Sequence, residues 1–135
     1  MSPQTIFPAL RYQDAPAAID WLERAFGFER HQVIEDPGGT IAHAELRLGD
    51  AMIMLGSVRP PGTPGFSEVA PPPGSASLYV VVEDPDALSA RAAAAGAEIV
   101  AAPSDTDYGS RELTARDLEG NVWSFGTYQP WAEQA

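Results

Sequence analysis

The sequence predicts an α+β domain of two tandem βαβββ modules, with a curved mixed sheet around a central cup and the helices on its outer face. Two hairpins carry this prediction. Residues 111–128 alternate polar and apolar side chains, turn at 117–121 and continue as an aromatic and branched run. Residues 41–56 repeat this plan roughly 70 positions earlier, around Gly49 and Asp50. The matched spacing indicates an internal duplication.

The first module is expected to span residues 1–57. It opens with a strand at 5–12, where Pro8 has no amide hydrogen to donate and therefore favours an edge or a bulge. A helix should follow, because Asp14 can cap it, Pro16 suits its first turn and Gly27 can end it. Its apolar residues fall on one face: Ala18, Ile19, Leu22, Ala25 and Phe26.

A strand at 28–35, a turn at 36–39 and the 41–56 hairpin complete this module. Residues 58–74 are then rich in proline and glycine, with too little apolar periodicity for a helix or strand. They predict a linker. The second module and tail take up residues 75–135 within the same structural domain.

The second module repeats the order of the first. We expect a strand at 77–82 and a helix that begins at Asp84 and Pro85 and ends at Gly96. A strand at 97–101 leads into the terminal hairpin. We interpret Trp21, Phe26 and Trp123 as packing between helix and sheet, whereas Trp131 in the tail could cover a cup or a partner subunit.

Composition excludes several classes of function. The net charge of −11 argues against nucleic-acid and anionic-membrane partners, which both require a basic surface. No cysteine is present, so disulfides, thiolate metal sites and a cysteine nucleophile are excluded. No apolar run approaches the roughly 20 residues that span a membrane, and the first residues lack a signal-peptide pattern. We therefore expect a soluble, cytoplasmic protein.

Strand parity separates the two faces of each hairpin. If the turn at Gly49 sets Leu48 opposite Ala51, Glu45 lies opposite Met54 and Arg47 opposite Met52 on a mixed face. In the second hairpin, the mixed face sets Thr114 opposite Ser124 and Arg116 opposite Val122. The alternate residues are apolar and should pack under the helices: Ala44, Leu46, Ile53, Leu55, Leu113, Ala115, Trp123 and Phe125.

Three segments carry a family resemblance. RYQDAPAAIDWLERAFGFE at 11–29, AELRLGD at 44–50 and RDLEGNVW at 116–123 resemble the vicinal oxygen chelate superfamily, which includes glyoxalase I, bleomycin-resistance proteins, fosfomycin-resistance enzymes and extradiol dioxygenases. The resemblance covers nearly the whole chain except the linker and implies the paired βαβββ fold. Residues 108–112 with the strand that follows look most like its PhnB-like branch.

The resemblance also implies where a metal would be held. Metal enzymes of the superfamily carry His or Glu ligands on inner strand positions, which correspond here to Phe7, Met54, Ser77 or its neighbour Leu78, and Ser124. None of these is a usual ligand for hard divalent ions. The expectation is therefore no metal and no cofactor.

Several residues are candidates for a small-molecule site in the cup. Tyr79, Tyr108 and the methionines could form an aromatic and adaptable lining, although each alone could equally be core. Either Glu112 with Arg116, or Arg111, should enter the cup. The complete candidate set is Phe7, His43, Glu45, Arg47, Met52, Met54, Tyr79, Tyr108, Arg111, Glu112, Thr114, Arg116 and Ser124.

We interpret the chain first as a metal-independent binding protein, similar to bleomycin-resistance-type sequestering proteins. Its acidic charge favours a cationic metabolite or drug, and a homodimer is expected. The alternative is a lyase or isomerase that uses Glu45 or Glu112 as acid and base, or a non-standard metal site around His43 and Glu45. A purely structural interpretation of His43 and Glu45 is a hydrogen-bonded cluster on the sheet.

A third possibility is a structural or regulatory dimer whose cup is filled by its own side chains. No catalytic residue is assigned, and the sequence leaves open whether modules pair within one chain or between chains.

Overall fold

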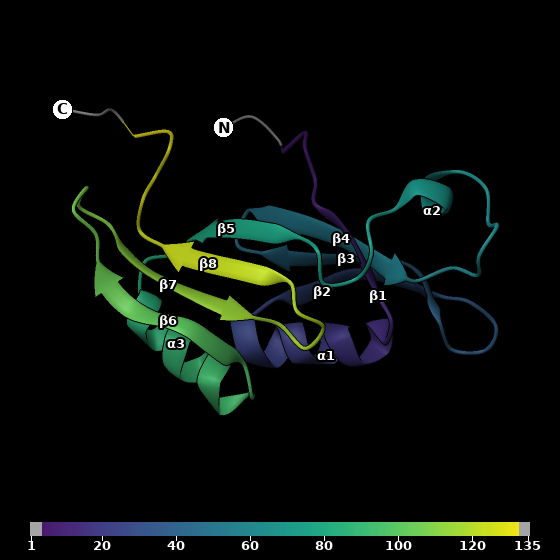
Figure 1. The fold of residues 1–135 in the computed structure, drawn as a ribbon, viewed down its shortest axis with the longest axis horizontal. Helices are drawn as coiled ribbons and strands as arrows, with labels where there is room; N and C mark the ends of the chain where they lie inside the picture. Colours follow the sequence, from purple (N-terminus) through teal and green to yellow (C-terminus); the bar gives the residue numbers. More distant parts are fainter. Residues whose placement is uncertain (1–3, 133–135) are drawn as a thin grey trace.

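The computed structural model describes residues 4–132 and consists of two βαβββ modules in tandem (Figure 1). The first module contains β1 (Ala9–Tyr12), α1 (Ala15–Phe26), β2 (Glu29–Glu35), β3 (Ile41–Leu48) and β4 (Ala51–Ser57). After a connection that carries α2 (Phe66–Val69), the second contains β5 (Ser77–Val81), α3 (Pro85–Ala94), β6 (Glu98–Asp105), β7 (Arg111–Arg116) and β8 (Val122–Gly126). The predicted fold class and module order are confirmed.

Each module builds its own four-stranded mixed sheet. The strand order is β1-β4-β3-β2 in the first and β5-β8-β7-β6 in the second, with β1 parallel to β4 and β5 parallel to β8. The identical order is the structural form of the sequence duplication. β1 lies at the edge of the first sheet, as Pro8 predicted. The Pro8 carbonyl accepts a hydrogen bond from the Met54 amide, but a proline has no amide hydrogen to donate to a further strand.

The registers of both hairpins agree with the parity argument. Glu45 lies opposite Met54, and Thr114 lies opposite Ser124. The alternate residues are buried, because successive side chains on a strand point to opposite faces. These buried residues are Ala44, Leu46, Ile53, Leu55, Leu113, Ala115, Trp123 and Phe125.

Local capping explains where the long helices begin and end. The Asp14 carboxylate accepts a hydrogen bond of 3.2 Å from the Ala17 amide at the start of α1. At its end Gly27 adopts φ +85°, a left-handed conformation that favours glycine. Asp84 caps α3 in the same way. Neither long helix, nor α2, is long and apolar enough to cross a membrane.

Three segments differ from the sequence prediction. The first strand was expected at 5–12, but β1 begins only at Ala9, after Pro8. Residues 58–74 were expected to hold no regular element, but α2 forms a single helical turn there, a length too short for apolar periodicity to reveal. β6 extends to Asp105 and passes the predicted end at 101. It tolerates Pro103 because β6 is an edge strand and its pairing with β7 shifts register between Ala101 and Ser104.

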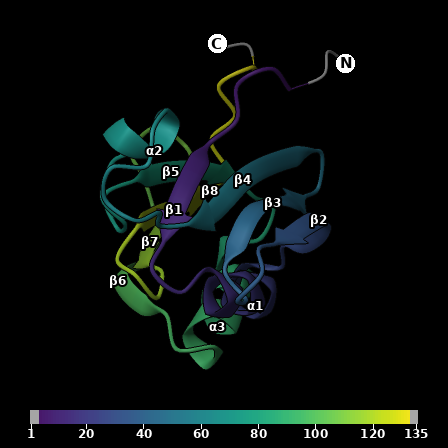
Figure 2. The ribbon, with the colours of Figure 1, turned by 90° about the vertical axis from the view of Figure 1, so that its right-hand side faces the viewer.

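The two modules share one apolar core. α1 and α3 lie side by side beneath the sheets (Figures 1 and 2), and the Trp21 indole donates a hydrogen bond of 2.7 Å to the Ala95 carbonyl. The ring of Phe26 lies 5.2 Å from that of Trp123 and 4.8 Å from that of Phe125, measured between centroids. The predicted packing between helix and sheet is confirmed for Phe26 and Trp123, whereas the contacts of Trp21 are with Phe26 on its own helix and with the end of α3. The opposite face of each sheet points away from this core, and we call these two surfaces the open faces.

Candidate functional site

The open face of the first sheet carries a carboxylate between two histidines. His43 and Glu45 alternate on β3 and therefore share a face, where His43 Nε2 lies 2.9 Å from Glu45 Oε2. His31 reaches the same carboxylate because a bulge in β2 falls at this residue, and its Nε2 lies 3.8 Å from Glu45 Oε1. The structure thus brings together His43 and Glu45 as predicted and adds His31.

An open cavity of about 250 Å³ adjoins this face between β1, β4 and α2. His43 and Met54, both candidates from the sequence, line it. Phe7 precedes β1 and is not among the lining residues, and Arg47 lies on the exposed rim with Glu29. The lining consists of Ala9, Leu10, Arg11, Ala42, His43, Met54, Leu55, Gly56 and Phe66.

The strand pairing identifies which residues occupy the places where the resemblance implied metal ligands. Ala9 lies opposite Met54, and Tyr79 lies opposite Ser124, so Ala9 and Tyr79 replace Phe7 and Ser77 in the pairs. A methyl group, a thioether, a phenol and a hydroxyl do not fit a divalent metal of the kind such enzymes use. Within residues 4–132, no group of three or more His, Asp or Glu side chains could hold a metal ion.

The open face of the second sheet holds a second carboxylate, surrounded by hydroxyl groups. Glu112 Oε1 accepts a hydrogen bond of 2.6 Å from the Tyr108 hydroxyl. Glu112 Oε2 accepts bonds of 2.7 Å from Tyr79 and 3.1 Å from Ser110. The Tyr128 ring meets that of Tyr108 edge to face at 5.8 Å between centroids, and its amide donates to the Tyr79 hydroxyl. We call these five residues the Glu112 cluster.

Hydrogen bonding keeps this carboxylate charged. The bond from Tyr108 is the main cause that lowers the pKa of Glu112, and those from Tyr79 and Ser110 add to it, against partial desolvation. The pKa of Tyr108 is raised mainly by its bond to Glu112, so its proton stays on the phenol. Within the described chain, Glu112 forms no ion pair with an arginine or a histidine. An ionised carboxylate beside exposed aromatic rings is an arrangement that suits a cation.

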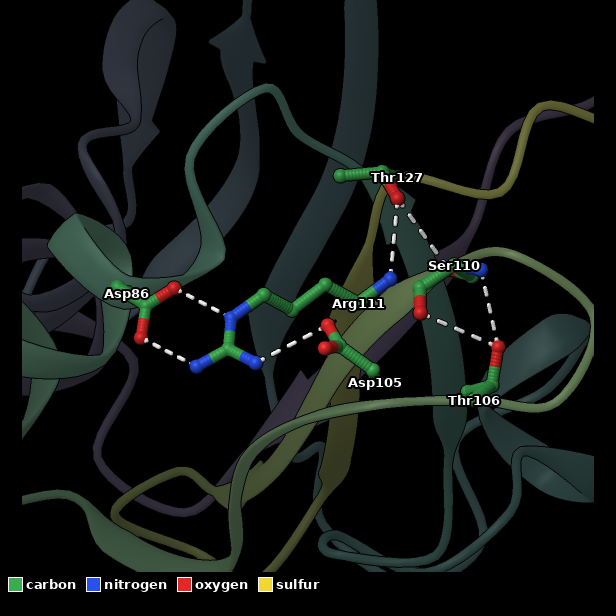
Figure 3. Close-up of polar contacts among 6 residues, drawn as sticks. All are labelled: Asp86, Asp105, Thr106, Ser110, Arg111 and Thr127. Carbon is green, nitrogen blue, oxygen red and sulfur yellow. Dashed lines mark hydrogen bonds and ion pairs between the residues drawn. The ribbon is translucent and has the colours of Figure 1, made fainter.

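Arg111 is directed away from this cluster. Its guanidinium donates hydrogen bonds of 2.6 and 2.9 Å to the two carboxylate oxygens of Asp86 on α3 and one of 3.1 Å to Asp105 (Figure 3). Of the two alternatives in the sequence, Glu112 therefore lies on the open face and Arg111 does not. Arg116 lies with Glu98 on an exposed edge.

The remaining candidates lie apart from the hydrogen-bonded centres. Thr114 and Ser124 bond to each other at 3.1 Å on the second open face, and Met52 lies opposite Arg47 on the first. No hydrogen bond or ion pair of the described residues joins the first open face to the Glu112 cluster. One chain thus presents two separate groups of functional side chains.

The structure also includes residues in these groups that sequence reasoning missed. Ser110 precedes β7 and lay outside the predicted strand, so strand parity did not reach it. Tyr128 lay at the end of the predicted strand, and alternation carried on from Ser124 would have placed it on the mixed face. Arg11 is the residue before Tyr12 in the first strand and was read as part of a family phrase. Phe66 lay in the segment read as a linker. Alternation along β1 would have placed Arg11 on the open face with Ala9.

Comparison with known proteins agrees with this architecture. Residues 6–125 match the family described as the Glyoxalase/Bleomycin resistance protein/Dioxygenase superfamily. An uncharacterized protein of Mycobacterium bovis is 33% identical over 121 residues, which cover 88% of this chain and 80% of that protein. The matches therefore include both modules.

Two solved structures illustrate the likeness. TioX from Micromonospora sp. ML1 has a TM-score of 0.78 and 34% identity, with 93% of this chain and 99% of TioX covered. TnmS3, described as an antibiotic binding protein from Streptomyces sp. CB03234, has a TM-score of 0.69 and 22% identity, with 93% and 96% covered. At that identity the second likeness concerns the fold.

Proposed function

The chain belongs to the glyoxalase/bleomycin resistance protein/dioxygenase superfamily, and we propose that it captures a small organic molecule on its open sheet faces without a metal ion. The donor set supports the metal-free part of this proposal. Ala9, Met54, Tyr79 and Ser124 occupy the paired strand positions and offer no pair of imidazole or carboxylate ligands. We also keep the PhnB-like branch as a proposal, based on residues 108–112.

The Glu112 cluster carries the proposal and points to a cationic group on the ligand. Its carboxylate is ionised, lacks a cationic partner among the described residues and lies beside the rings of Tyr79, Tyr108 and Tyr128. A bound ammonium would gain the carboxylate charge and the electron-rich ring faces together. The net charge of −11 would attract such a ligand from a distance.

Binding fits this cluster better than proton transfer. A general base works best when its pKa lies near the operating pH, whereas the hydroxyl donors lower the pKa of Glu112 and make it a weaker base. TnmS3, which shares the fold, is by description an antibiotic binding protein. That precedent supports capture of a drug or metabolite by this scaffold.

A homodimer is part of the proposal. The open faces point away from the shared core of one chain, so a single copy leaves both uncovered. A second copy could cover these faces and enclose a ligand, whereas a single sheet contacts the ligand from one side. Such an arrangement would pair modules between chains.

The His43–Glu45 pair favours a second candidate function. A hydrogen-bonded imidazole and carboxylate on an open face could transfer a proton in a lyase or isomerase reaction of this superfamily. This alternative predicts turnover of a bound substrate. Capture predicts that the ligand is recovered unchanged.

The experiment is a binding titration with a cationic aromatic probe on protein treated with a chelator. Benzyltrimethylammonium is followed by amide shifts in ¹⁵N NMR, with benzyl alcohol as the uncharged probe of similar size. We expect the cation to shift amides around Tyr79 and Tyr128 and the alcohol to bind about tenfold more weakly. The quaternary ammonium has no N–H to donate, so its preference comes from the charge of Glu112 and from cation–π contacts with the tyrosine rings, which contribute about 0.5–1 kcal/mol each at exposed sites. Glu112→Gln should lose most of this preference.

Glu35→Gln is the matched control, because Glu35 is exposed on β2 in the other module. It removes the same charge and should leave the titration unchanged. Equal binding of both probes to the parent protein would overturn the cationic assignment. Binding that appears after a divalent ion is added, and disappears with chelator, would overturn the metal-free assignment.

A further inference from the structure

The cavity between β1, β4 and α2 has an unusual charge for such an acidic protein. Its described lining is mainly apolar and contains one permanently charged side chain, Arg11, beside His43. A second hollow of about 130 Å³ also has Arg11 in its lining, together with Val58, Arg59, Ser67, Ala70 and the prolines at 71–73. Arg11 therefore lines two hollows, one with Phe66 and one with Ser67 of α2.

Arg11 lacks the counter-ion that most other arginines have. Its guanidinium makes one long hydrogen bond of 3.5 Å to the Ser57 carbonyl and lies 5.0 Å above the Phe66 ring centre. No carboxylate within residues 4–132 forms an ion pair with it. By contrast, five arginines pair with carboxylates: Arg30, Arg47, Arg59, Arg111 and Arg116.

The surroundings of Arg11 make an anion favourable there. Partial burial is the main cause that lowers its pKa, and the nearby positive charge of Arg59 adds to it. Both effects disfavour an unpaired guanidinium, so an anion that reaches Arg11 would relieve desolvation and repulsion together. Asp36 does not serve this purpose, because it is bound to Arg59.

We propose that this cavity binds an organic anion, a carboxylate attached to an apolar body, with the carboxylate on Arg11. The planar guanidinium can donate two parallel hydrogen bonds to a carboxylate, a match that an ammonium lacks. Phe66, Leu55 and Met54 offer the apolar body a contact surface inside the cavity. The site uses different residues from the Glu112 cluster, and it therefore goes beyond the function proposed above.

The overall negative charge does not prevent this interaction. At physiological ionic strength, charges farther than about 8 Å are largely screened, whereas a partly buried contact is screened much less. Remote carboxylates would slow the arrival of an anion, and the direct contact with Arg11 would decide its affinity.

The test compares phenylacetate with phenylacetamide, which differ in charge and little in shape. Both are titrated by ¹⁵N NMR into the full chain, with the amides of β1 and β4 as reporters. Phenylacetate should shift these amides and bind at least about tenfold more tightly than the amide, as expected for a charge-assisted contact. Arg11→Met should remove this preference, and Arg24→Met, which removes an exposed charge on α1, should retain it.

A second variant tests the guanidinium position without changing any charge. A Cβ on Gly56 would lie 2.5 Å from Arg11 Nη1, so Gly56→Ala should push the guanidinium aside and weaken phenylacetate binding. Equal affinity of the two probes for the parent protein, or undiminished phenylacetate binding by folded Arg11→Met, would overturn the proposal. Binding of benzyltrimethylammonium is followed at amides around Tyr79 and Tyr128, and binding of phenylacetate at amides of β1 and β4. The two titrations are therefore separate, and the anion proposal can be refuted while the cation proposal holds, or the reverse.

Discussion

The Tyr12 hydroxyl donates a hydrogen bond of 2.7 Å to the Asp117 carboxylate, and this buried contact joins the first strand to the terminal hairpin. The same carboxylate oxygen accepts bonds of 3.0 Å from the Asn121 amide group and the Trp123 indole. Its other oxygen accepts the backbone amides of Glu119 and Asn121. Five donors from both modules thus stabilise this buried carboxylate, which forms no ion pair with any of residues 4–132.

Tyr12→Phe should destabilise the domain by about 1.5–3 kcal/mol, the usual range for a hydrogen bond to a charged group. The ring would remain packed, so the loss would come from the missing donor. The free energy of unfolding is measured by urea denaturation followed by tryptophan fluorescence. Tyr108→Phe is the control, because that hydroxyl donates to a carboxylate at the surface and should contribute much less. Equal losses would show that Tyr12 does not join the modules in this way.

Gly27→Ala should be more destabilising than Gly96→Ala. Both glycines have positive φ, +85° and +92°, so an alanine at either position meets a backbone penalty of about 1–2 kcal/mol. At Gly27 the added Cβ would also approach Arg91 Nη1 to 3.2 Å, whereas nothing lies within 4 Å at Gly96. Arg91 donates to the carbonyls of Glu23 and Arg24 and so connects α3 with the end of α1. Thermal denaturation of the two variants isolates that interhelical contribution, and indistinguishable midpoints would argue against it.

The sequence predicted most of the fold because its signals are local. Cap residues such as Asp14 and Gly27, hairpin turns and strand alternation each depend on a few neighbouring residues, and all agree with the structure. Contacts between modules depend on residues far apart in the chain. Asp117 could be read as a turn residue, but its role as the acceptor for Tyr12 requires knowing that the two modules share a core.

The candidate site was predictable to the same degree. Parity placed Glu45 on a mixed face but left open whether Glu112 or Arg111 faces the cup, since that choice depends on the position of Asp86 on α3. Arg11 and Phe66 meet because a segment read as a linker forms a helical turn beside β1. A single turn has no periodicity that a sequence could reveal.

The pH dependence of stability should report the ionised state of Glu112. Because its pKa is lowered on folding, its contribution is complete above the ordinary glutamate pKa of about 4.3 and is lost as pH falls through the lower folded value. The stability difference between the parent protein and Glu112→Gln should therefore shrink on acidification. Urea denaturation from about pH 7 to about pH 3 measures this change across the unfolded pKa. A difference that is constant with pH would contradict it.

Arg111→Met should affect α3 and leave ligand binding intact. Its ion pairs with Asp86 and Asp105 are partly exposed, so we expect a small loss of stability that diminishes with added salt. The affinity for benzyltrimethylammonium should not change, because Arg111 is directed away from the Glu112 cluster. Unfolding and probe titration are measured on the same sample. A large change in probe affinity without a change in stability would show that Arg111 takes part in ligand binding.

Glu45→Ala should weaken ligand binding at the first open face without abolishing folding. Glu45 is half-buried beside His43 and accepts no bond from the shared core, so truncation leaves that core intact. A cationic ligand held by this carboxylate should bind Glu45→Ala more weakly. Phenylacetate in the adjoining cavity should bind this variant more tightly, because a negative charge near the cavity is removed.

A second variant at Glu45 distinguishes capture from catalysis. Glu45→Gln keeps the shape and hydrogen-bonding capacity of the side chain but cannot act as a base. A binding role predicts that the Gln variant, which loses the same charge, shifts the two probe affinities in the same directions as Ala. A base role predicts that both variants abolish turnover of any substrate while Gln retains its binding, because proton abstraction requires the carboxylate itself. Unchanged affinity of Glu45→Ala for both charged probes would exclude Glu45 from the ligand site.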